Sequence, residues 1–376
     1  MVVFYFGADS TWSALQSIGF RRRNTCILKA LAECDMVKKL FVVRKAGRRE
    51  YIKYLLQSKP SFSKVEDIPY LEVLPKKLSE KLGLSSLNKR INAYLLHRAA
   101  RRVGGQVFLW CYWPRGYAAA IESGIKGTLI FDADHNIIDD PNIRDEQRPL
   151  REQLLLQIGA RARYILSSSV SMIEWYSQRG FKNCVRLRNG VERGRFHVMA
   201  SQARSEPPKI GYCGTLSKWI NYDLFAALVA RNPSWQFIII GKPWLTDEWQ
   251  VLKQYSNVNF LGEKTASEVA QILPEFDVAV NLYRFHPALD ADSMKLYEYI
   301  AAGIPTVSTR FHSNLEKDFD GLLLLGDTVE DIELHIRNVL GTAKKSHSDT
   351  ARRFLEKSTW NRRVNDFIST IQYDNA

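Results

Sequence analysis

Short apolar runs recur along the first half of the chain, separated by glycine turns, polar loops and amphipathic stretches. We predict buried strands at Val2–Phe6, Lys39–Val43, Val107–Trp113, Gly127–Phe131, Tyr164–Ser169 and Val185–Glu192. A helix is predicted at about Asn24–Val37, and a turn at Pro114-Arg115-Gly116. Nearly continuous apolar strands that alternate with helices are typical of a parallel sheet in an α/β protein.

The second half of the chain repeats this pattern. We predict strands at Lys209–Thr215, Trp235–Ile240, Asn257–Glu263, Phe276–Tyr283 and Leu322–Leu325, and helices at Asp331–Leu340 and Trp360–Ile368. Both halves open with a strand that enters a glycine turn, Val2–Gly7 and Lys209–Gly214. We therefore expect two Rossmann-like domains in tandem. Neither opening carries G-x-G-x-x-G, so dinucleotide redox chemistry is not indicated.

Length and composition agree with two globular domains. The chain has 376 residues, of which 45% are hydrophobic and 25% charged. Its five cysteines are scattered without a C-x-x-C pair, which favours a reduced cytoplasmic protein without structural disulfides or zinc. The first residues lack the pattern of a signal peptide, and no apolar run approaches the ~20 residues that span a bilayer.

The net charge of +13 is concentrated in one half of the chain. Residues 1–208 hold 35 Lys and Arg against 19 Asp and Glu, whereas residues 209–376 hold 18 against 21. This asymmetry predicts an anionic partner for the first half, such as a membrane surface or a polyanionic substrate. No helix-turn-helix, zinc or RNA-binding aromatic motif is visible, so nucleic acid is not the expected partner.

Two basic segments of the first half are candidates for binding that anionic partner. Residues 76–102 carry Leu87, Ile91, Tyr94 and Leu95 at helical spacing among basic residues, a pattern typical of an interfacial helix. An ordinary helix that faces the core and has a charged outer side gives the same pattern. Arg21-Arg22-Arg23 is either solvated loop charge or a contact with lipid headgroups or an anionic acceptor.

The predicted strand Gly127–Phe131 runs directly into Asp132-Ala-Asp-His-Asn136. Open α/β sheets place their chemistry at the carboxyl ends of strands, and a carboxylate there can accept a proton from a hydroxyl group. These side chains are therefore candidates for a catalytic base, although carboxylates that only cap the next helix would look the same. Asp132-x-Asp134 and Asp290-x-Asp292 also resemble the metal-binding DxD pair of GT-A glycosyltransferases, a two-residue match of low specificity.

Residues 290–309 predict a loop, a short helix, a glycine stop and a strand. Asp290, Asp292 and Ser293 are typical N-cap residues, Met294–Ala302 has no helix breaker, and Gly303 and Pro305 end the helix. The free amides at Ser293–Lys295 and the charge of Lys295 can bind an anion. Glu298 lies one turn further on the same face, where it can accept hydrogen bonds from a sugar diol. A nucleoside diphosphate offers both groups, but a capped helix with a surface Lys–Glu pair has the same sequence.

The spacing of Asp290 and Glu298, followed by Ala301-Ala-Gly-Ile-Pro-Thr306, resembles the E-x7-E signature of GT-B glycosyltransferases, with Asp in the first position. Ser293-Met-Lys-Leu-Tyr-Glu-Tyr299 is similar to the subgroup of the xanthan-type glucuronosyltransferase and the teichuronic-acid glycosyltransferases. Asn189-Gly-Val-Glu192 with Phe196 resembles the segment that ends the first domain in many GT-B enzymes. The likeness covers most of the chain and is strongest over residues 209–310.

The resemblance implies two Rossmann-like domains with parallel sheets that face a central cleft, and a C-terminal helix that crosses back to the first domain. The expected bounds are 1–196 for the acceptor-binding domain, 197–208 for the linker, 209–355 for the nucleotide-sugar domain and 356–376 for the helix. The implied activity is transfer of a sugar from a nucleoside diphosphate sugar, UDP-linked, to a glycan or lipid-linked acceptor at the inner face of the membrane, without a metal or cofactor.

The resemblance also implies roles for single residues. As the base of an inverting reaction Asp134 is preferred, then Asp132 and then His135; in a retaining reaction His135 would instead contact the donor sugar. The expected donor-binding residues are Asp290, Ser293, Met294, Lys295, Glu298, Thr215, Lys218, Lys264 and Arg284. Thr215 and Ile220 stand where many relatives have Arg and Lys, which transfers phosphate binding to Lys295 and Lys218. A non-catalytic protein that binds a sugar nucleotide or a polyanion is the alternative outside enzymes.

Overall fold

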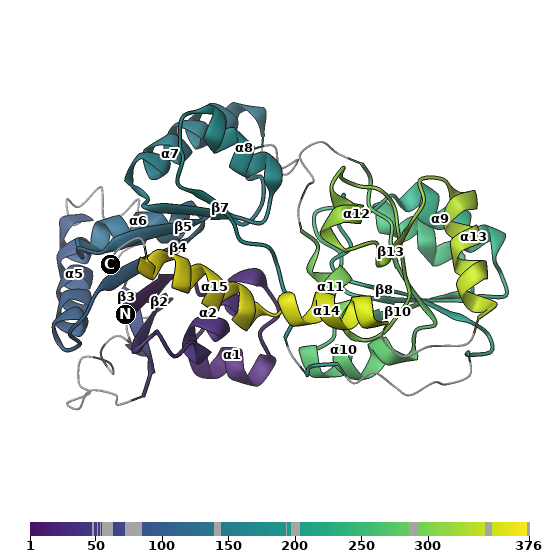
Figure 1. Ribbon diagram of the computed structural model, residues 1–376, viewed down its shortest axis with the longest axis horizontal. Helices are drawn as coiled ribbons and strands as arrows, with labels where there is room; N and C mark the ends of the chain where they lie inside the picture. Colours follow the sequence, from purple (N-terminus) through teal and green to yellow (C-terminus); the bar gives the residue numbers. More distant parts are fainter. Residues whose placement is uncertain are drawn as a thin grey trace. The chain divides into compact units, whose positions relative to one another are not determined.

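The computed structural model describes residues 1–46, 49–50, 52, 54, 63–71, 85–138, 144–192, 194–196, 204–285, 290, 292–342 and 348–373. The chain forms two compact units, which Figure 1 shows. Unit 1 consists of Met1–Arg188 and Val364–Ala376, and unit 2 consists of Asn189–Arg363.

Unit 1 contains a parallel sheet whose described strands follow the order β3-β2-β1-β4-β5-β6-β7. These strands are β1 (Val2–Phe6), β2 (Lys39–Ala46), β3 (Val65–Leu71), β4 (Val107–Tyr112), β5 (Thr128–Asp132), β6 (Tyr164–Ser167) and β7 (Cys184–Arg186). The helices are α1 (Trp12–Ile18), α2 (Arg23–Glu33), α5 (Ser85–Arg101), α6 (Trp113–Ser123), α7 (Arg148–Arg161) and α8 (Val170–Gln178), with a 3-10 turn at Asp145–Gln147. The strand order reverses between β1 and β4, which are adjacent, and ligands of such sheets bind at that point.

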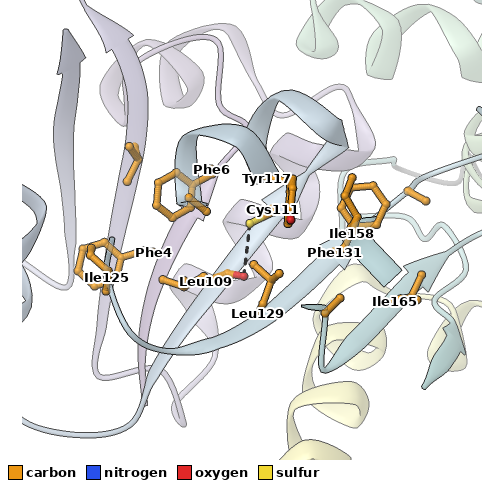
Figure 2. Packing of buried hydrophobic residues seen from close by; sticks show 14 of the residues in the cluster. Phe4, Phe6, Leu109, Cys111, Tyr117, Ile125, Leu129, Phe131, Ile158 and Ile165 are labelled. Carbon is orange, nitrogen blue, oxygen red and sulfur yellow. Dashed lines mark hydrogen bonds between the residues drawn. The ribbon is translucent and has the colours of Figure 1, made fainter. Parts of the chain in front are cut away.

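The central strands of unit 1 are buried on both faces, which explains their continuous apolar sequence. Figure 2 shows one face, where alternate residues of three strands pack with residues of α6, α7 and β6. The residues labelled there are Phe4, Phe6, Leu109, Cys111, Tyr117, Ile125, Leu129, Phe131, Ile158 and Ile165. Trp110, between Leu109 and Cys111 in the sequence, instead packs its ring edge-on against Phe367 at 5.6 Å. Residues of α15 (Trp360–Tyr373) from Val364 onward belong to unit 1.

The turn predicted at Pro114-Arg115-Gly116 is wrong, because these residues form the first turn of α6. Proline is favourable at the start of a helix, where its missing N–H group would have no partner. Gly116 is required by packing, since a Cβ atom at this position would lie 2.3 Å from the carbonyl oxygen of Phe6. The helix therefore begins directly at the carboxyl end of β4, against the end of β1.

The apolar residues predicted to form one stripe along residues 76–102 do not all lie on one face of α5. Leu95 is buried in the core, as are Leu96 and Asn92, whereas Tyr94 is 63% exposed beside exposed Arg90. This arrangement is that of a helix facing the core with a basic outer side. Residues 76–84 and the side chain of Leu87 lie outside the described part of the chain.

Unit 2 contains a second parallel sheet, with the described strands in the order β10-β9-β8-β11-β12-β13. They are β8 (Lys209–Cys213), β9 (Gln236–Ile240), β10 (Val258–Gly262), β11 (Val278–Asn281), β12 (Thr306–Ser308) and β13 (Leu323–Leu325). The helices are α9 (Tyr222–Arg231), α10 (Ala266–Ile272), α11 (Met294–Ala301), α12 (Leu315–Asp318), α13 (Val329–Leu340) and α14 (Asp349–Lys357), with 3-10 segments at Glu248–Gln254 and Leu273–Glu275. Here the strand order reverses between β8 and β11, which pair directly.

The two parallel sheets confirm the predicted α/β fold class with two Rossmann-like domains. Helix α11 packs against the core of unit 2 through Leu296, Tyr297, Tyr299 and Ile300. Because these residues fix the helix, Lys295 and Glu298 project from a rigid element rather than from a loop.

Candidate active site

The loop before α11 is held by Asp292, which is 3% exposed. Its Oδ2 accepts a hydrogen bond from the backbone N–H of Asn189 at 2.6 Å, and the hydroxyl of Tyr297 donates to Oδ1 and Oδ2 at 2.8 and 2.9 Å. The side-chain amide of Asn189 donates to the carbonyl of Asp292. Asn189 therefore helps to position the start of the helix, beyond the tight turn that its sequence predicts.

Lys295 lies at the carboxyl edge of the sheet, where β8 and β11 meet. It is 9% exposed, and its ammonium donates a hydrogen bond to the hydroxyl of Tyr283, just after β11. The ammonium also lies 4.2 Å from the ring centre of Tyr283 and 5.0 Å from that of Tyr212. On the β8 side, a Cβ atom at Gly214 would lie 2.7 Å from Cε and 3.1 Å from Nζ of Lys295. Glycine at this turn therefore leaves space for the side chain of Lys295. The predicted glycine turn after β8 and the predicted anion-binding helix start thus lie in contact.

Glu298 lies one turn along α11, and its side chain is 19% exposed. Burial raises its pKa above the usual glutamate value, while Arg195 and Lys295 act in the opposite direction. The guanidinium of Arg195 is 3.7 Å from the carboxylate of Glu298 and also pairs with Glu192. Burial raises the pKa of the Cys213 thiol to about 12, and the nearby carboxylate of Glu298 contributes to this rise. A partly exposed carboxylate in such surroundings can accept hydrogen bonds from hydroxyl groups of a ligand.

The other predicted donor residues have different surroundings. Asp290 is buried, and Ser293 and Met294 are half-buried at the start of α11. Thr215 and Lys218 are exposed on the turn after β8. Lys264 is 4.0 Å from Glu268 and Arg284 is 2.5 Å from Glu248, so these two side chains make surface ion pairs. Of the predicted donor residues, Lys295 and Glu298 thus lie one turn apart on α11, and the side chains of Lys264 and Arg284 are paired with glutamates.

Asp132 lies at the end of β5 and is fully buried. Its Oδ1 accepts a hydrogen bond from Nε of Arg23 at 3.2 Å and another from the backbone N–H of Asp134 at 3.0 Å. Burial raises the pKa of Asp132, Arg23 lowers it and Asp134 raises it, with a net rise. Because no part of this carboxylate is accessible, its contacts fit a structural role.

Asp134 has the opposite character, since its side chain is 18% exposed. The hydroxyl of Tyr112 donates to its Oδ2 at 2.7 Å, Nδ1 of His135 lies 3.4 Å from the same oxygen, and Nε of Arg23 lies 3.5 Å from Oδ1. Burial alone would raise its pKa, but His135, Arg23 and Tyr112 together hold the pKa below the usual value for aspartate. Asp134 is therefore an ionised carboxylate that solvent can reach.

The backbone around Asp134 is in an unusual conformation. Asp134 has φ = 64°, and Trp113, the first residue of α6 after the adjacent strand β4, has φ = 61°. Both lie in the left-handed region, which costs a residue other than glycine on the order of 1 kcal/mol and is common at functional sites. The conformation of Asp134 is fixed by its carbonyl, which accepts hydrogen bonds from Ser167 and from Ser168. His135 packs its ring against that of Trp113, with the ring centres 5.4 Å apart.

Several residues of these sites were not predicted as site residues, among them Arg195, Tyr283 and Arg23. Arg195 stands between Glu192 and Phe196 of the segment that resembles the end of the first domain in GT-B enzymes, and this position was the signal in the sequence. Tyr283 ends a predicted strand directly before Arg284, which is one of the predicted donor-binding residues. Arg23 is 3% exposed, so solvated charge and contact with lipid headgroups or an anionic acceptor are all wrong for this residue, although Arg21 and Arg22 are exposed.

Residues 207–342 match the sequence family described as glycosyl transferases group 1. This part of the chain is therefore similar to the group 1 glycosyltransferases. The matched residues include the glycine turn after β8 and all of α11, so both halves of the Lys295 site lie within the match.

One curated relative was found for the chain, TuaH of Bacillus subtilis (strain 168), assigned as a teichuronic acid biosynthesis glycosyltransferase. It is 23% identical over 158 residues, which cover 40% of the chain and 40% of the relative. The chain is therefore matched to less than half of the length of this curated relative.

Solved structures extend the likeness to the whole chain. The lipopolysaccharide outer core galactosyltransferase WaaB in its apo form matches with a TM-score of 0.63 at 16% identity, over 100% of both chains. HepE of Anabaena in complex with UDP-glucose matches with a TM-score of 0.64 at 14% identity, over 98% of this chain and 99% of that one. At these identities the likeness shows the fold, which is GT-B.

Proposed function

We propose that the chain transfers a sugar from a nucleoside diphosphate sugar, UDP-linked, to a glycan or lipid-linked acceptor in the biosynthesis of a cell-surface polysaccharide. Support comes from the match to group 1 glycosyltransferases, from a relative named for teichuronic acid biosynthesis and from a structural neighbour named as a lipopolysaccharide outer core galactosyltransferase. The UDP-glucose complex of HepE supports a UDP-linked donor. The observation that carries the proposal is the ammonium of Lys295 held beside Gly214 and Tyr283, with Glu298 one turn away.

The donor is proposed to bind across the start of α11. Lys295 and the free amides at Ser293–Lys295 bind the diphosphate, whose charge the N-terminal end of the helix dipole also favours. Glu298 accepts hydrogen bonds from the ribose hydroxyls, and Asp290 and Met294 complete the pocket. Thr215 and Lys218, on the turn after β8, contact the phosphates from the opposite side.

The reaction is proposed to invert the anomeric carbon. Asp134 accepts the proton of the acceptor hydroxyl, whose oxygen forms a bond to the anomeric carbon. The bond between that carbon and the diphosphate oxygen breaks, and the electron pair leaves with the nucleoside diphosphate. Lys295 and the helix amides stabilise the charge that develops on the leaving group, so the proposal requires no metal ion. Anomeric analysis of the product by NMR tests the stereochemistry, since a retained configuration would exclude Asp134 as a base in direct displacement.

Donor binding is tested by thermal unfolding of the full chain with UDP-, GDP- and dTDP-sugars. A ligand at 100 times its Kd stabilises a protein by about 2.7 kcal/mol, which is measurable as a rise in Tm. We expect the UDP-sugars to give the largest rise, and Lys295→Ala and Glu298→Ala each to abolish it. Lys264→Ala and Arg284→Ala remove cations that are paired with glutamates, and should weaken donor binding less than threefold.

The matched control is Lys317→Ala, which removes an exposed cation from α12 of the same unit. It should leave the donor-induced rise in Tm unchanged. A wild-type rise in both Lys295→Ala and Glu298→Ala would contradict the proposed donor site. Donor binding without transfer to any acceptor, unaffected by changes at Asp132 and Asp134, would favour a non-catalytic binder.

Peripheral association with the inner face of the membrane is a further part of the proposal. None of the helices in the described part of the chain is both long enough and apolar enough to cross a bilayer. The support is the excess of basic residues in residues 1–208. We expect the chain to sediment with phosphatidylglycerol-containing vesicles at low salt and to be released at high salt. Equal binding to pure phosphatidylcholine vesicles would contradict this part.

A further inference from the structure

Arg23 is a buried cation in a position that a helix disfavours. It is the first residue of α2 and is 3% exposed. The N-terminal end of a helix carries a partial positive charge, so an arginine in the first turn is repelled. Removing a guanidinium from water is costly unless anions pair with it. The placement of Arg23 therefore depends on the carboxylates that it contacts.

Those carboxylates are Asp132 and Asp134, 109 and 111 positions later in the sequence. Nε and Nη2 of Arg23 each lie 3.2 Å from Oδ1 of Asp132, and Nε lies 3.5 Å from Oδ1 of Asp134. The same Oδ1 of Asp132 accepts the backbone N–H of Asp134. A planar guanidinium thus spans the buried carboxylate and the accessible one, an arrangement that a lysine cannot reproduce.

The first turn of α2 is fixed to the sheet beside these carboxylates. The side-chain amide of Asn24 donates to the carbonyl of Gly7 at 3.0 Å, and the hydroxyl of Tyr5 donates to the carbonyl of Asn24 at 2.8 Å. Gly7 and Tyr5 lie at the carboxyl end of β1, which pairs with β4, where Tyr112 contacts Asp134. The backbone around Arg23 is therefore fixed beside β1 and β4, where the strand order of unit 1 reverses.

We propose that Arg23 is a positioning residue that holds the carboxylate of Asp134 ionised and oriented toward the acceptor hydroxyl. The inference rests on the proposed function, in which Asp134 is the base. The ionisable groups around Asp134 are Arg23 of α2, Tyr112 of β4, Tyr5 of β1, Asp132 of β5 and the adjacent His135. Arg23 and His135 favour its ionised form and Asp132 opposes it. Asp132 acts through Arg23, since it fixes the guanidinium and is itself inaccessible.

The test measures the pKa of Asp134 in the full chain by NMR of carboxyl-labelled aspartate. The resonance of Asp134 is the one missing from Asp134→Asn. In Arg23→Met we expect that pKa to rise by about one unit or more, which is the usual effect of losing an adjacent arginine. Arg23→Lys keeps the charge and should leave most of the pKa shift in place. Arg22→Met, which removes an exposed cation one residue away, is the matched control and should leave the pKa unchanged.

If Arg23→Met leaves too little folded protein, the same comparison is made in a protein that also carries Asp132→Asn. Asp132→Asn removes the buried charge and still offers an oxygen to the backbone N–H of Asp134. The pKa of Asp134 should be higher in Arg23→Met/Asp132→Asn than in Asp132→Asn alone. An equal pKa in the two proteins would overturn the inference.

Turnover separates a failure of this inference from a failure of the proposed function. Release of nucleoside diphosphate is measured with the sugar nucleotide that stabilises the chain most. We expect Arg23→Met to lower kcat at least tenfold at neutral pH, to move the acidic limb of its pH profile upward, and to leave donor KM within threefold. A wild-type kcat and pH profile in Arg23→Met, together with an inactive Asp134→Asn, would overturn only the role of Arg23. Wild-type turnover in Asp134→Asn would overturn both.

Discussion

The two candidate sites differ in how much of each comes from one stretch of sequence. In unit 2, Lys295 and Glu298 lie within one helix, and the residues before them set where that helix begins. In unit 1, the carboxylates Asp132 and Asp134 depend on Arg23, which precedes them by more than 100 residues. A site that lies on one helix can be recognised from its own sequence, whereas a site assembled by packing cannot.

The same comparison explains why two carboxylates of one loop have opposite properties. Asp132 and Asp134 are two residues apart, yet burial raises the pKa of Asp132 and the contacts of Asp134 lower its pKa. Pairs of ionisable groups whose pKa values are driven apart are common where one residue serves as base and the other as support. In unit 2, Glu298 has a raised pKa because burial outweighs Arg195 and Lys295.

The largest effect is expected at Asp134. Asp134→Asn keeps the size of the side chain and removes its ability to accept a proton, so the transfer rate should fall by about 10²–10⁴, the usual contribution of a general base. Donor binding in unit 2 should be unchanged, as measured by thermal unfolding with the UDP-sugar. The pKa of Asp134 is lowered, so the wild-type rate should decline only at a pH below the usual pKa of aspartate.

Asp145→Asn is the matched control for this change. Asp145 lies in the same unit, and its side chain is 90% exposed. Its transfer rate should stay within twofold of wild type. A full rate in Asp134→Asn would remove the distinction between the two sites, because neither carboxylate of unit 1 would then act as the base.

A smaller effect is expected at Asp292, which supports the start of α11. Asp292→Ala leaves the buried N–H of Asn189 and the hydroxyl of Tyr297 without their acceptor, at a cost of about 1–3 kcal/mol for each group. The Tm of unit 2 should fall by roughly 2–4 °C for each kcal/mol. Asp247→Ala, at an exposed aspartate of the same unit, should change the Tm by less than about 2 °C. An unchanged Tm in Asp292→Ala would show that α11 is positioned by its apolar face alone.

The smallest effect is a pH-dependent change in stability at Glu298. The folded pKa of Glu298 lies above its unfolded value, so the charged carboxylate destabilises the fold as the pH rises through this interval. Glu298→Gln should therefore raise the Tm at neutral pH, by an amount that disappears below the usual pKa of glutamate. Each unit of pKa difference is worth about 1.4 kcal/mol. Glu316→Gln, at an exposed site on α12, should show no such pH dependence.

The contrary result would be a Tm for Glu298→Gln that is equal to or below that of wild type at neutral pH. It would mean that Arg195 and Lys295 outweigh the effect of burial on Glu298. The carboxylate would then stabilise the unit rather than serve a ligand at a cost in stability.

The sequence predicted the fold from periodicity, because every central strand is buried on both faces and therefore has a continuous apolar run. It missed the start of α6, where Pro114 and Gly116 resemble a turn but suit the first turn of a helix against β1. The choice between a helix and a turn there depended on the approach of Phe6, which is more than 100 residues away.

For the sites, the sequence located the segments but not their partners. The place of Lys295 at a helix start predicts anion binding, whereas its contacts with Tyr283 and Gly214 depend on the pairing of β8 with β11. The resemblance implies donor contacts for Lys264 and Arg284, but their pairing with Glu268 and Glu248 depends on side-chain geometry. Arg23 could not be distinguished from Arg21 and Arg22, because burial is a property of the packed unit.

The central claim is that α11 binds the diphosphate and ribose of the donor. A crystal structure of the full chain with UDP tests this claim most directly. The account predicts phosphate oxygens within hydrogen-bond distance of Nζ of Lys295 and of the amides at Ser293–Lys295, with the ribose hydroxyls on the carboxylate of Glu298. UDP bound away from α11, with Lys295 still hydrogen-bonded to Tyr283 alone, would contradict it.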